Sequence, residues 1–83
     1  MLQKSDKRLQ VEEISLPDTF IGKAISALDL KRHPQTLILA IKTKDGWRYN
    51  PPRDYVIQIA DILVYISTPE GKDELERFLH AAQ

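Results

Sequence analysis

A short cationic run, Lys31-Arg32-His33, contains the side chains of this sequence that are best suited to binding a ligand. Lysine and arginine recognise phosphate and carboxylate groups through charge-assisted hydrogen bonds, so the run could receive a small anion. A run of this kind also suits a solvent-exposed corner between two elements. Both interpretations stay open on these residues alone.

Side chains that could act in catalysis or bind a metal are poorly grouped. The chain has no cysteine, which excludes disulfides and thiolate zinc sites, and no serine lies in a Gly-x-Ser-x-Gly context. The two histidines, His33 and His80, are far apart and are expected to face solvent. Asp54, Asp61 and Glu70 lack the spacing of a calcium loop, and Asp61 is expected to be a turn residue that bonds its own backbone. The sequence therefore predicts neither enzyme activity nor a metal site.

Length and charge restrict the classes of protein to which the chain can belong. Its 83 residues suit one domain, expected to span residues 9–83 after a polar lead-in or linker at residues 1–8. The 12 basic and 12 acidic side chains cancel, whereas a nucleic-acid binder normally has a basic excess. No apolar run reaches the roughly 18 residues of a membrane helix, and residues 1–8 contain no secretory apolar core. We therefore expect no nucleic-acid partner and no direct membrane insertion.

The first part of the domain is predicted to form a strand followed by a helix. Apolar and polar residues alternate from Leu9 to Leu16, with one extra residue at Glu12-Glu13 that predicts a β-bulge there. Pro17 ends this strand, and Asp18 or Thr19 is placed to cap a helix. That helix is expected to bury three apolar residues at helical spacing, Ile21, Ile25 and Leu28.

Two apolar runs predict buried strands. Leu37–Ile41 is continuously apolar, as expected of a strand buried on both faces. A hairpin follows, because Asp45-Gly46 is typical of a type I′ turn, in which both residues have positive φ. Trp47–Asn50 is the return strand, and Pro51-Pro52 ends it. Ile62–Ile66 is the second apolar run.

The remaining segments connect and cover these strands. Arg53–Ile59 is ambiguous between a short strand and an extended loop, and Ala60-Asp61 is expected to be a turn. Thr68-Pro69-Glu70 begins the final helix. The apolar stripe of that helix is Leu75, Phe78, Leu79 and Ala82. The order β-α-β-β-β-α predicts an α+β fold, a two-layer sandwich with a small, mostly antiparallel sheet and both helices available for one face.

This order of motifs resembles the RCK C-terminal domain, also called the TrkA-C domain, from about Val11 to Leu79. The family has a Gly-Lys helix that ends in Leu-x-Leu or Leu-x-Ile-Arg, and then an apolar strand that ends in Ala-Ile and a basic residue. Asp-Gly, Asn-Pro and Gly-Asp pairs precede the last strand in many members. The corresponding segments here are Ile21–Ile25, Leu28–Arg32, Leu39–Lys42, Asp45-Gly46, Asn50-Pro51, Ala60-Asp61 and Ser67–Glu70.

The resemblance implies a homodimer whose paired lobes form a crevice for a ligand. Several members bind cyclic di-AMP there, so the implied ligand is a small anion such as a cyclic dinucleotide or a nucleotide. In those members the position of Leu37 is typically Asn, and Leu cannot make that polar contact. The family's contacts, with Lys31 and Arg32 as alternatives for one basic contact, fall on Leu28, Lys31, Arg32, Leu37, Ile38, Ala40 and Pro51.

The implied function is regulatory. The chain would be the ligand-sensing and dimerisation domain of a potassium channel or potassium transporter, with a preceding nucleotide-binding lobe and a membrane pore or transporter domain in the parent protein. That parent would hold the domain in the cytoplasm at the inner face of the cell membrane. Ligand binding would shift a dimer between two geometries and so control gating. The alternative is the effector-binding domain of a transcription regulator or of another membrane transporter.

Overall fold

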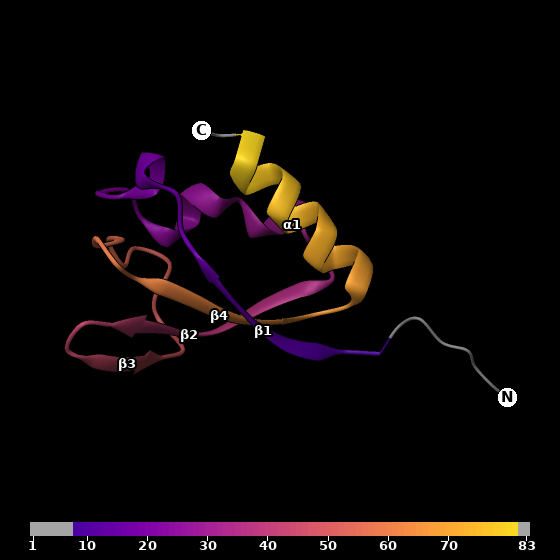
Figure 1. Ribbon diagram of the computed structural model, residues 1–83, viewed down its shortest axis with the longest axis horizontal. Coiled ribbons are helices and arrows are strands. Elements are labelled where there is room, and N and C mark those ends of the chain that lie inside the picture. Colours follow the sequence, from indigo (N-terminus) through magenta and orange to yellow (C-terminus); the bar gives the residue numbers. More distant parts are fainter. Residues whose placement is uncertain (1–7, 82–83) are drawn as a thin grey trace, which may run out of the picture.

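The structure, a computed structural model, describes residues 8–81, so nearly all of the expected lead-in lies outside the described residues. The elements in chain order are β1 Gln10–Ser15, the 3₁₀ turns η1 Asp18–Phe20, η2 Ile25–Leu28 and η3 Leu30–Arg32, then β2 Thr36–Thr43, β3 Gly46–Tyr49, β4 Ile62–Ser67 and α1 Pro69–Ala81. The strands form one sheet in the order β1-β4-β2-β3, and every neighbouring pair is antiparallel. The 3₁₀ turns and α1 pack on the same face of it (Figure 1). The predicted two-layer α+β fold is therefore confirmed.

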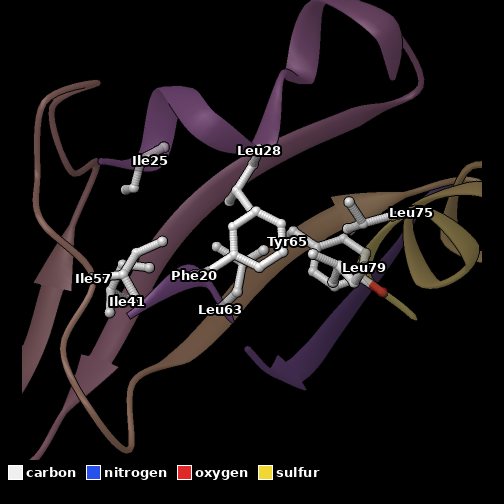
Figure 2. Packing of buried hydrophobic residues seen from close by; sticks show 9 residues of the cluster. All are labelled: Phe20, Ile25, Leu28, Ile41, Ile57, Leu63, Tyr65, Leu75 and Leu79. Atoms are coloured by element: carbon white, nitrogen blue, oxygen red, sulfur yellow. The ribbon is translucent and has the colours of Figure 1, made fainter. Parts of the chain in front are cut away.

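The hydrophobic core lies between this helical layer and one face of the sheet. Leu63 and Tyr65 of β4 and Ile41 of β2 point into it. The turns, the loop after β3 and α1 complete the cluster with Phe20, Ile25, Leu28, Ile57, Leu75 and Leu79. Figure 2 shows Tyr65 in the middle of these side chains. Because burying one such side chain contributes roughly 1.5–3 kcal/mol, this single cluster is the main source of stability.

The helix predicted from Ile21 to Leu28 is not formed, and the segment folds as η1 and η2 with extended residues between them. Gly22 has a φ of 87°. Its N–H donates to the carbonyl of Ile57, and the N–H of Ile57 donates to the carbonyl of Lys23. The carbonyl of Lys23 and the N–H groups of Ile25 and Ser26, which an α-helix would pair internally, all bond to the loop after β3 instead. Ile25 and Leu28 are buried as predicted, but Ile21 is exposed. The predicted capping by Asp18 or Thr19 is also wrong. Both residues lie inside η1, and η1 has no side-chain capping bond.

The predicted β-bulge occurs in a different strand. All 6 residues of β1 pair with β4 in unbroken register, so Glu12-Glu13 is not a bulge. Glu12 instead occupies an inward position beside Tyr65 at the edge of the sheet. The shift in register lies in β2 between Ile38 and Ala40. The expectation that β2 is buried on both faces holds only in part, because Leu37 is 63% exposed.

The β2–β3 hairpin forms, but its turn is not type I′. Lys44-Asp45 is the loop, Gly46 pairs with Thr43, and of these residues Gly46 alone has a positive φ. The side chain of Thr43 explains the difference. Its Oγ1 accepts the N–H of Asp45 at 3.1 Å and donates to the carbonyl of Gly46 at 2.8 Å. These bonds close the turn without a left-handed Asp45.

The opposite face of the sheet is apolar, and no element of residues 8–81 packs over it. By strand register and alternation this open face consists of Val11, Leu37, Ala40, Trp47, Tyr49, Ile62, Val64 and Ile66. Val11, Leu37, Trp47 and Tyr49 are exposed on it, whereas Ala40 and Val64 are buried. The Trp47 ring is 48% exposed and stacks on Tyr49 at 5.7 Å between centroids. Lys42 Nζ lies 5.4 Å from the Trp47 ring centre and 3.2 Å from a carboxylate oxygen of Glu13. A large apolar surface is thus left beside a few charged groups.

The final helix begins where predicted and is attached to the sheet through polar side chains. Thr68 Oγ1 accepts the N–H of Gly71 at 3.0 Å and so caps α1. The Thr68 hydroxyl also donates to the side chain of Gln35, and the hydroxyls of Thr36 and Ser67 share a hydrogen bond of 2.9 Å. These bonds hold the first turn of α1 close against β2 and β4.

Gly71→Ala is expected to destabilise the fold by about 1–3 kcal/mol, the usual cost of overpacking. The new Cβ would clash with Ser67 Oγ and would lie 3.0 Å from Gln35 Cβ. Urea unfolding followed by circular dichroism measures the loss. In a Ser67→Ala background, which lacks the nearest clashing atom, the further loss caused by Gly71→Ala should be smaller. Equal losses in the two backgrounds would contradict the close approach of α1 to β4.

Ala60→Gly is expected to stabilise the fold by about 0.5–1 kcal/mol, because Ala60 forms the predicted turn with a φ of 70°. The left-handed conformation is unfavourable for a residue with a Cβ, whereas glycine adopts it freely. The matched control is Ala24→Gly, at a φ of −76°, which should destabilise. Thermal unfolding compares the two, and a loss of stability at both positions would contradict strain at Ala60.

Candidate functional site

A cleft of about 520 Å³ opens between η2, η3 and the loop that follows β3. A volume of this size is in the range of small-molecule sites. Its lining combines cationic, polar and apolar side chains, namely Ile25, Ser26, Asp29, Leu30, Lys31 and Arg53. We call it the basic cleft.

Backbone pairing between two distant segments builds one wall of the basic cleft. The N–H of Ile25 donates to the carbonyl of Tyr55 at 2.9 Å, and the N–H of Ser26 donates to the carbonyl of Arg53 at 3.0 Å. Asp29, with a φ of 55°, then changes the direction of the chain between η2 and η3. Aspartate is among the few residues that tolerate this left-handed conformation. The result is that cationic side chains from two separate parts of the chain line one cleft.

The basic cleft can hold an anion beside an apolar group. Lys31 and Arg53 supply positive charge, and the hydroxyl of Ser26 can donate a hydrogen bond. The one acidic side chain of the lining is Asp29, whose Oδ2 lies 3.6 Å from Nη1 of Arg32, a residue outside the lining. This ion pair offsets part of the negative charge. Together with the apolar lining, the arrangement suits a phosphate ester that carries a flat or aliphatic group.

The two alternatives for the basic contact, Lys31 and Arg32, lie in different places. Lys31 lines the basic cleft. Arg32 lines a separate cavity of about 340 Å³ against α1, together with His33, Glu74, Arg77 and Phe78. Lys31 is therefore the better placed of the two to join Arg53 in binding an anion.

The expectation that His33 faces solvent is wrong. Its side chain is only 7% exposed, and its ring packs edge-on against Phe78 with 5.2 Å between centroids. Neither ring nitrogen has a hydrogen-bond partner among residues 8–81. Packing against α1 therefore accounts for its burial, whereas His80 is exposed as predicted.

The other predicted contacts are not gathered into the basic cleft. Leu28 is fully buried in the core, so it cannot touch a ligand in this arrangement. Leu37 and Ala40 lie on the open face, whereas Ile38 packs against the core on the opposite face. Pro51 is half-buried just after β3. Within one protomer, these positions therefore do not form a single surface.

Arg53 is the cleft residue that sequence reasoning missed. The segment that carries it proves to be a loop with an isolated bridge between Ala24 and Val56. No local pattern marks Arg53, because a hydrogen bond from the distant Ser26 brings it to the cleft. The sequence feature that could have indicated Arg53 is its position directly after Pro51-Pro52, where the chain must leave the sheet.

A larger cleft of about 570 Å³ lies between the β2–β3 hairpin and the loop at residues 55–61, and we call it the hairpin cleft. Asp61 in its wall is 3% exposed. Oδ2 of Asp61 accepts the hydroxyl of Tyr55 at 2.7 Å and the N–H of Gln58 at 2.9 Å, so Asp61 is the turn residue that the sequence predicted. The guanidinium of Arg48 lies 5.6 Å from the centre of the Tyr55 ring.

Two tyrosine hydroxyls are held in the neutral form. Burial, and then the hydrogen bond to Asp61, raise the pKa of Tyr55 to about 12. Burial, and then the neighbouring carboxylates of Glu76 and Glu12, raise the pKa of Tyr65 to about 12. Both groups therefore stay protonated throughout the physiological range.

Residues 8–81 contain no group of three or more His, Cys, Asp or Glu side chains that could hold a metal ion. None of the helices in this part of the chain is long and apolar enough to cross a membrane. Both clefts present cationic side chains beside one or two carboxylates, and the hairpin cleft adds the aromatic rings of Trp47 and Tyr55.

A small antiparallel sheet, covered on one face by 3₁₀ turns and a single helix, defines the chain as a two-layer α+β domain. Residues 11–80 match the family described as the TrkA-C domain, and the chain belongs to that family. The resemblance that the sequence motifs indicated is therefore confirmed.

Several solved structures share the fold. The RCK domain of GsuK superposes with a TM-score of 0.76 at 23% identity, covering 92% of this chain and 17% of that one. The RCK C domain of the potassium transport protein KtrA, in complex with cyclic di-AMP, gives 0.75 at 23% identity, covering 83% of this chain and 81% of that one. The RCK_C domain dimer of S. agalactiae BusR, in complex with cyclic di-AMP, gives 0.70 at 20% identity, covering 87% and 91%. The chain thus corresponds to a small part of GsuK and to most of the other two chains.

The free energy of unfolding is expected to fall as the pH rises from about 10 to about 12, the ordinary and raised pKa values of Tyr55 and Tyr65. A raised pKa means that folding favours the protonated hydroxyl, so this stabilisation is complete below pH 10 and is lost on passing through pH 12. Denaturant titrations at several pH values measure it. The Tyr55→Phe, Tyr65→Phe double variant should lose less stability over this range. If its free energy of unfolding fell with pH as steeply as that of the wild-type chain, the raised pKa values would be contradicted.

Proposed function

We propose that the chain is a non-catalytic, ligand-sensing domain that binds a small phosphate-bearing ligand in the basic cleft. The observation that carries this proposal is the pairing of Lys31 with Arg53 beside an apolar lining. A cyclic dinucleotide offers both phosphates and flat bases, and the KtrA and BusR domains of the same fold were solved with cyclic di-AMP. These features together favour a cyclic dinucleotide as the class of ligand.

The open face supports a homodimer as the working form. Leu37, Trp47 and Tyr49 are exposed on it, and monomeric proteins rarely leave a large contiguous apolar surface uncovered. A second copy would cover this surface and add to a core that is thin in a chain of 83 residues. The BusR structure supports this arrangement, since it is described as a dimer.

The proposed mechanism is a shift in population between two dimer geometries, of which the ligand binds one more tightly. The proposed parent is a potassium channel or transporter, with a nucleotide-binding lobe before this domain, which would place the domain at the inner face of the cell membrane. The likeness to a part of GsuK supports this parent. The second candidate is the effector-binding domain of a transcription regulator, which is supported by the same fold in BusR bound to busA-promotor DNA.

Titration calorimetry of the chain with cyclic di-AMP, cyclic di-GMP, ATP, ADP and NADH tests the proposal. We expect cyclic di-AMP to bind. Lys31→Ala and Arg53→Ala should each weaken binding by about 10–100-fold, because a charge-assisted hydrogen bond contributes about 1.5–3 kcal/mol. The matched control is Arg77→Ala, which removes one positive charge outside the basic cleft and should leave the affinity unchanged.

Three outcomes would contradict separate parts of this proposal. Absence of binding by every ligand in the series would refute the sensing function. Binding that is insensitive to Lys31→Ala and Arg53→Ala would place the site elsewhere. Light scattering that gives a monomer at all concentrations, with and without ligand, would refute the dimer.

A further inference from the structure

Backbone hydrogen bonds attach the loop that carries Arg53 to residues 22–26, and the bonds nearest Arg53 lie in the wall of the basic cleft. Two amides of η2, those of Ile25 and Ser26, donate to the carbonyls of Tyr55 and Arg53 at 2.9 and 3.0 Å. These bonds fix the backbone at Arg53, but the loop forms no strand of the sheet within residues 8–81. Further along the loop, Ile57 is buried in the core and exchanges two backbone bonds with Gly22 and Lys23. The loop also has a second attachment, made by a side chain close to Arg53.

Tyr55 provides that second attachment. Its carbonyl accepts the Ile25 N–H in the wall of the basic cleft, while its hydroxyl donates to Asp61 Oδ2 in the hairpin cleft at 2.7 Å. Asp61 directly precedes β4, whose side chains form the centre of the core. One side chain therefore ties the loop of Arg53 to the most deeply buried strand.

The Tyr55 hydroxyl is difficult to replace at this position. Asp61 is almost completely buried, and its Oδ1 has no hydrogen-bond partner among residues 8–81. Without the hydroxyl, the carboxylate would keep only the bond from the N–H of Gln58. A buried carboxylate that loses a donor is unfavourable, so the loop would move to regain a partner and would carry Arg53 with it.

We propose that Tyr55 and Asp61 form a latch that holds Arg53 in position to bind a ligand. Neither side chain lines the basic cleft, so both are positioning residues that act through Arg53. The latch orders the loop before the ligand arrives, which lowers the entropic cost of binding. The identity of the ligand in this inference rests on the proposed function. The attachment of the loop by Tyr55 and Asp61 does not depend on any ligand.

Amide hydrogen exchange measured by NMR without ligand tests the attachment of the loop. Tyr55→Phe removes the hydroxyl and keeps the ring beside Arg48. Exchange at the amides of Ile25 and Ser26 should become about tenfold faster, the effect of losing one hydrogen bond of ordinary strength, while the amides between β2 and β4 keep their rates. The control Tyr65→Phe removes a buried hydroxyl that has no partner among the described residues and should leave both amides unchanged.

Two results of the exchange experiment would overturn the latch. The first is unchanged exchange at Ile25 and Ser26 in Tyr55→Phe. The second is an equal acceleration over the whole sheet, which would show a general effect on stability.

A double-mutant cycle with cyclic di-AMP as the probe tests the action through Arg53. Tyr55→Phe should weaken binding by about tenfold in the wild-type chain and have little further effect in an Arg53→Ala background. Additive losses would show that Tyr55 acts independently of Arg53 and would overturn its positioning role. Asp61→Asn keeps an oxygen that accepts both donors and should bind like wild type, whereas Asp61→Ala should bind like Tyr55→Phe.

The two experiments separate the inference from the function on which it rests. If cyclic di-AMP does not bind the wild-type chain, the proposed function fails for that ligand. The exchange rates at Ile25 and Ser26 still decide whether the latch holds the loop.

Discussion

Burial of one face of β4 is the constraint on which the rest of this domain depends. Leu63 and Tyr65 lie on that face, and the 3₁₀ turns, the loop after β3 and α1 all pack against it. Val64, between them, points to the other side. The turns, the loop and α1 all lie on the core side, and no element of residues 8–81 packs over the other side. The apolar open face is therefore a consequence of the way in which the core is built.

The same one-sided packing determines where the clefts lie. Short turns cover a sheet less completely than a long helix would, and the loop after β3 must pass over the core to reach β4. This loop lines the basic cleft with Arg53 and the hairpin cleft with Tyr55. The fold is shared with domains at only 20–23% identity. Differences in ligand among members of the fold would arise in such loops.

Local patterns predicted the elements that depend on neighbouring residues, namely β2, β4, the hairpin and α1 with its cap. The turn type of the hairpin was wrong for a local reason, the hydrogen bonds of Thr43. Other predictions that failed depend on contacts between distant segments. Helical spacing indicated a first helix, but Gly22 pairs with a loop far along the chain instead. His33 is buried because Phe78 of α1 packs on it. For the site, the local cationic run identified Lys31, whereas Arg53 enters the cleft through long-range pairing that leaves no local pattern.

The position of β1 at the edge of the sheet has a mechanical consequence. This strand pairs with β4 alone, and the hydrogen bonds of an antiparallel pair lie perpendicular to the strands. A force applied at Gln10 along the direction of β1 would therefore load all 6 residue pairs together in shear. A force applied across the sheet would instead separate the pairs one at a time. Gln10 pairs with Ser67, immediately before the cap of α1. Tension on β1 would thus be transmitted to the junction of β4 and α1, and β1 would resist stretching as a unit with the rest of the domain.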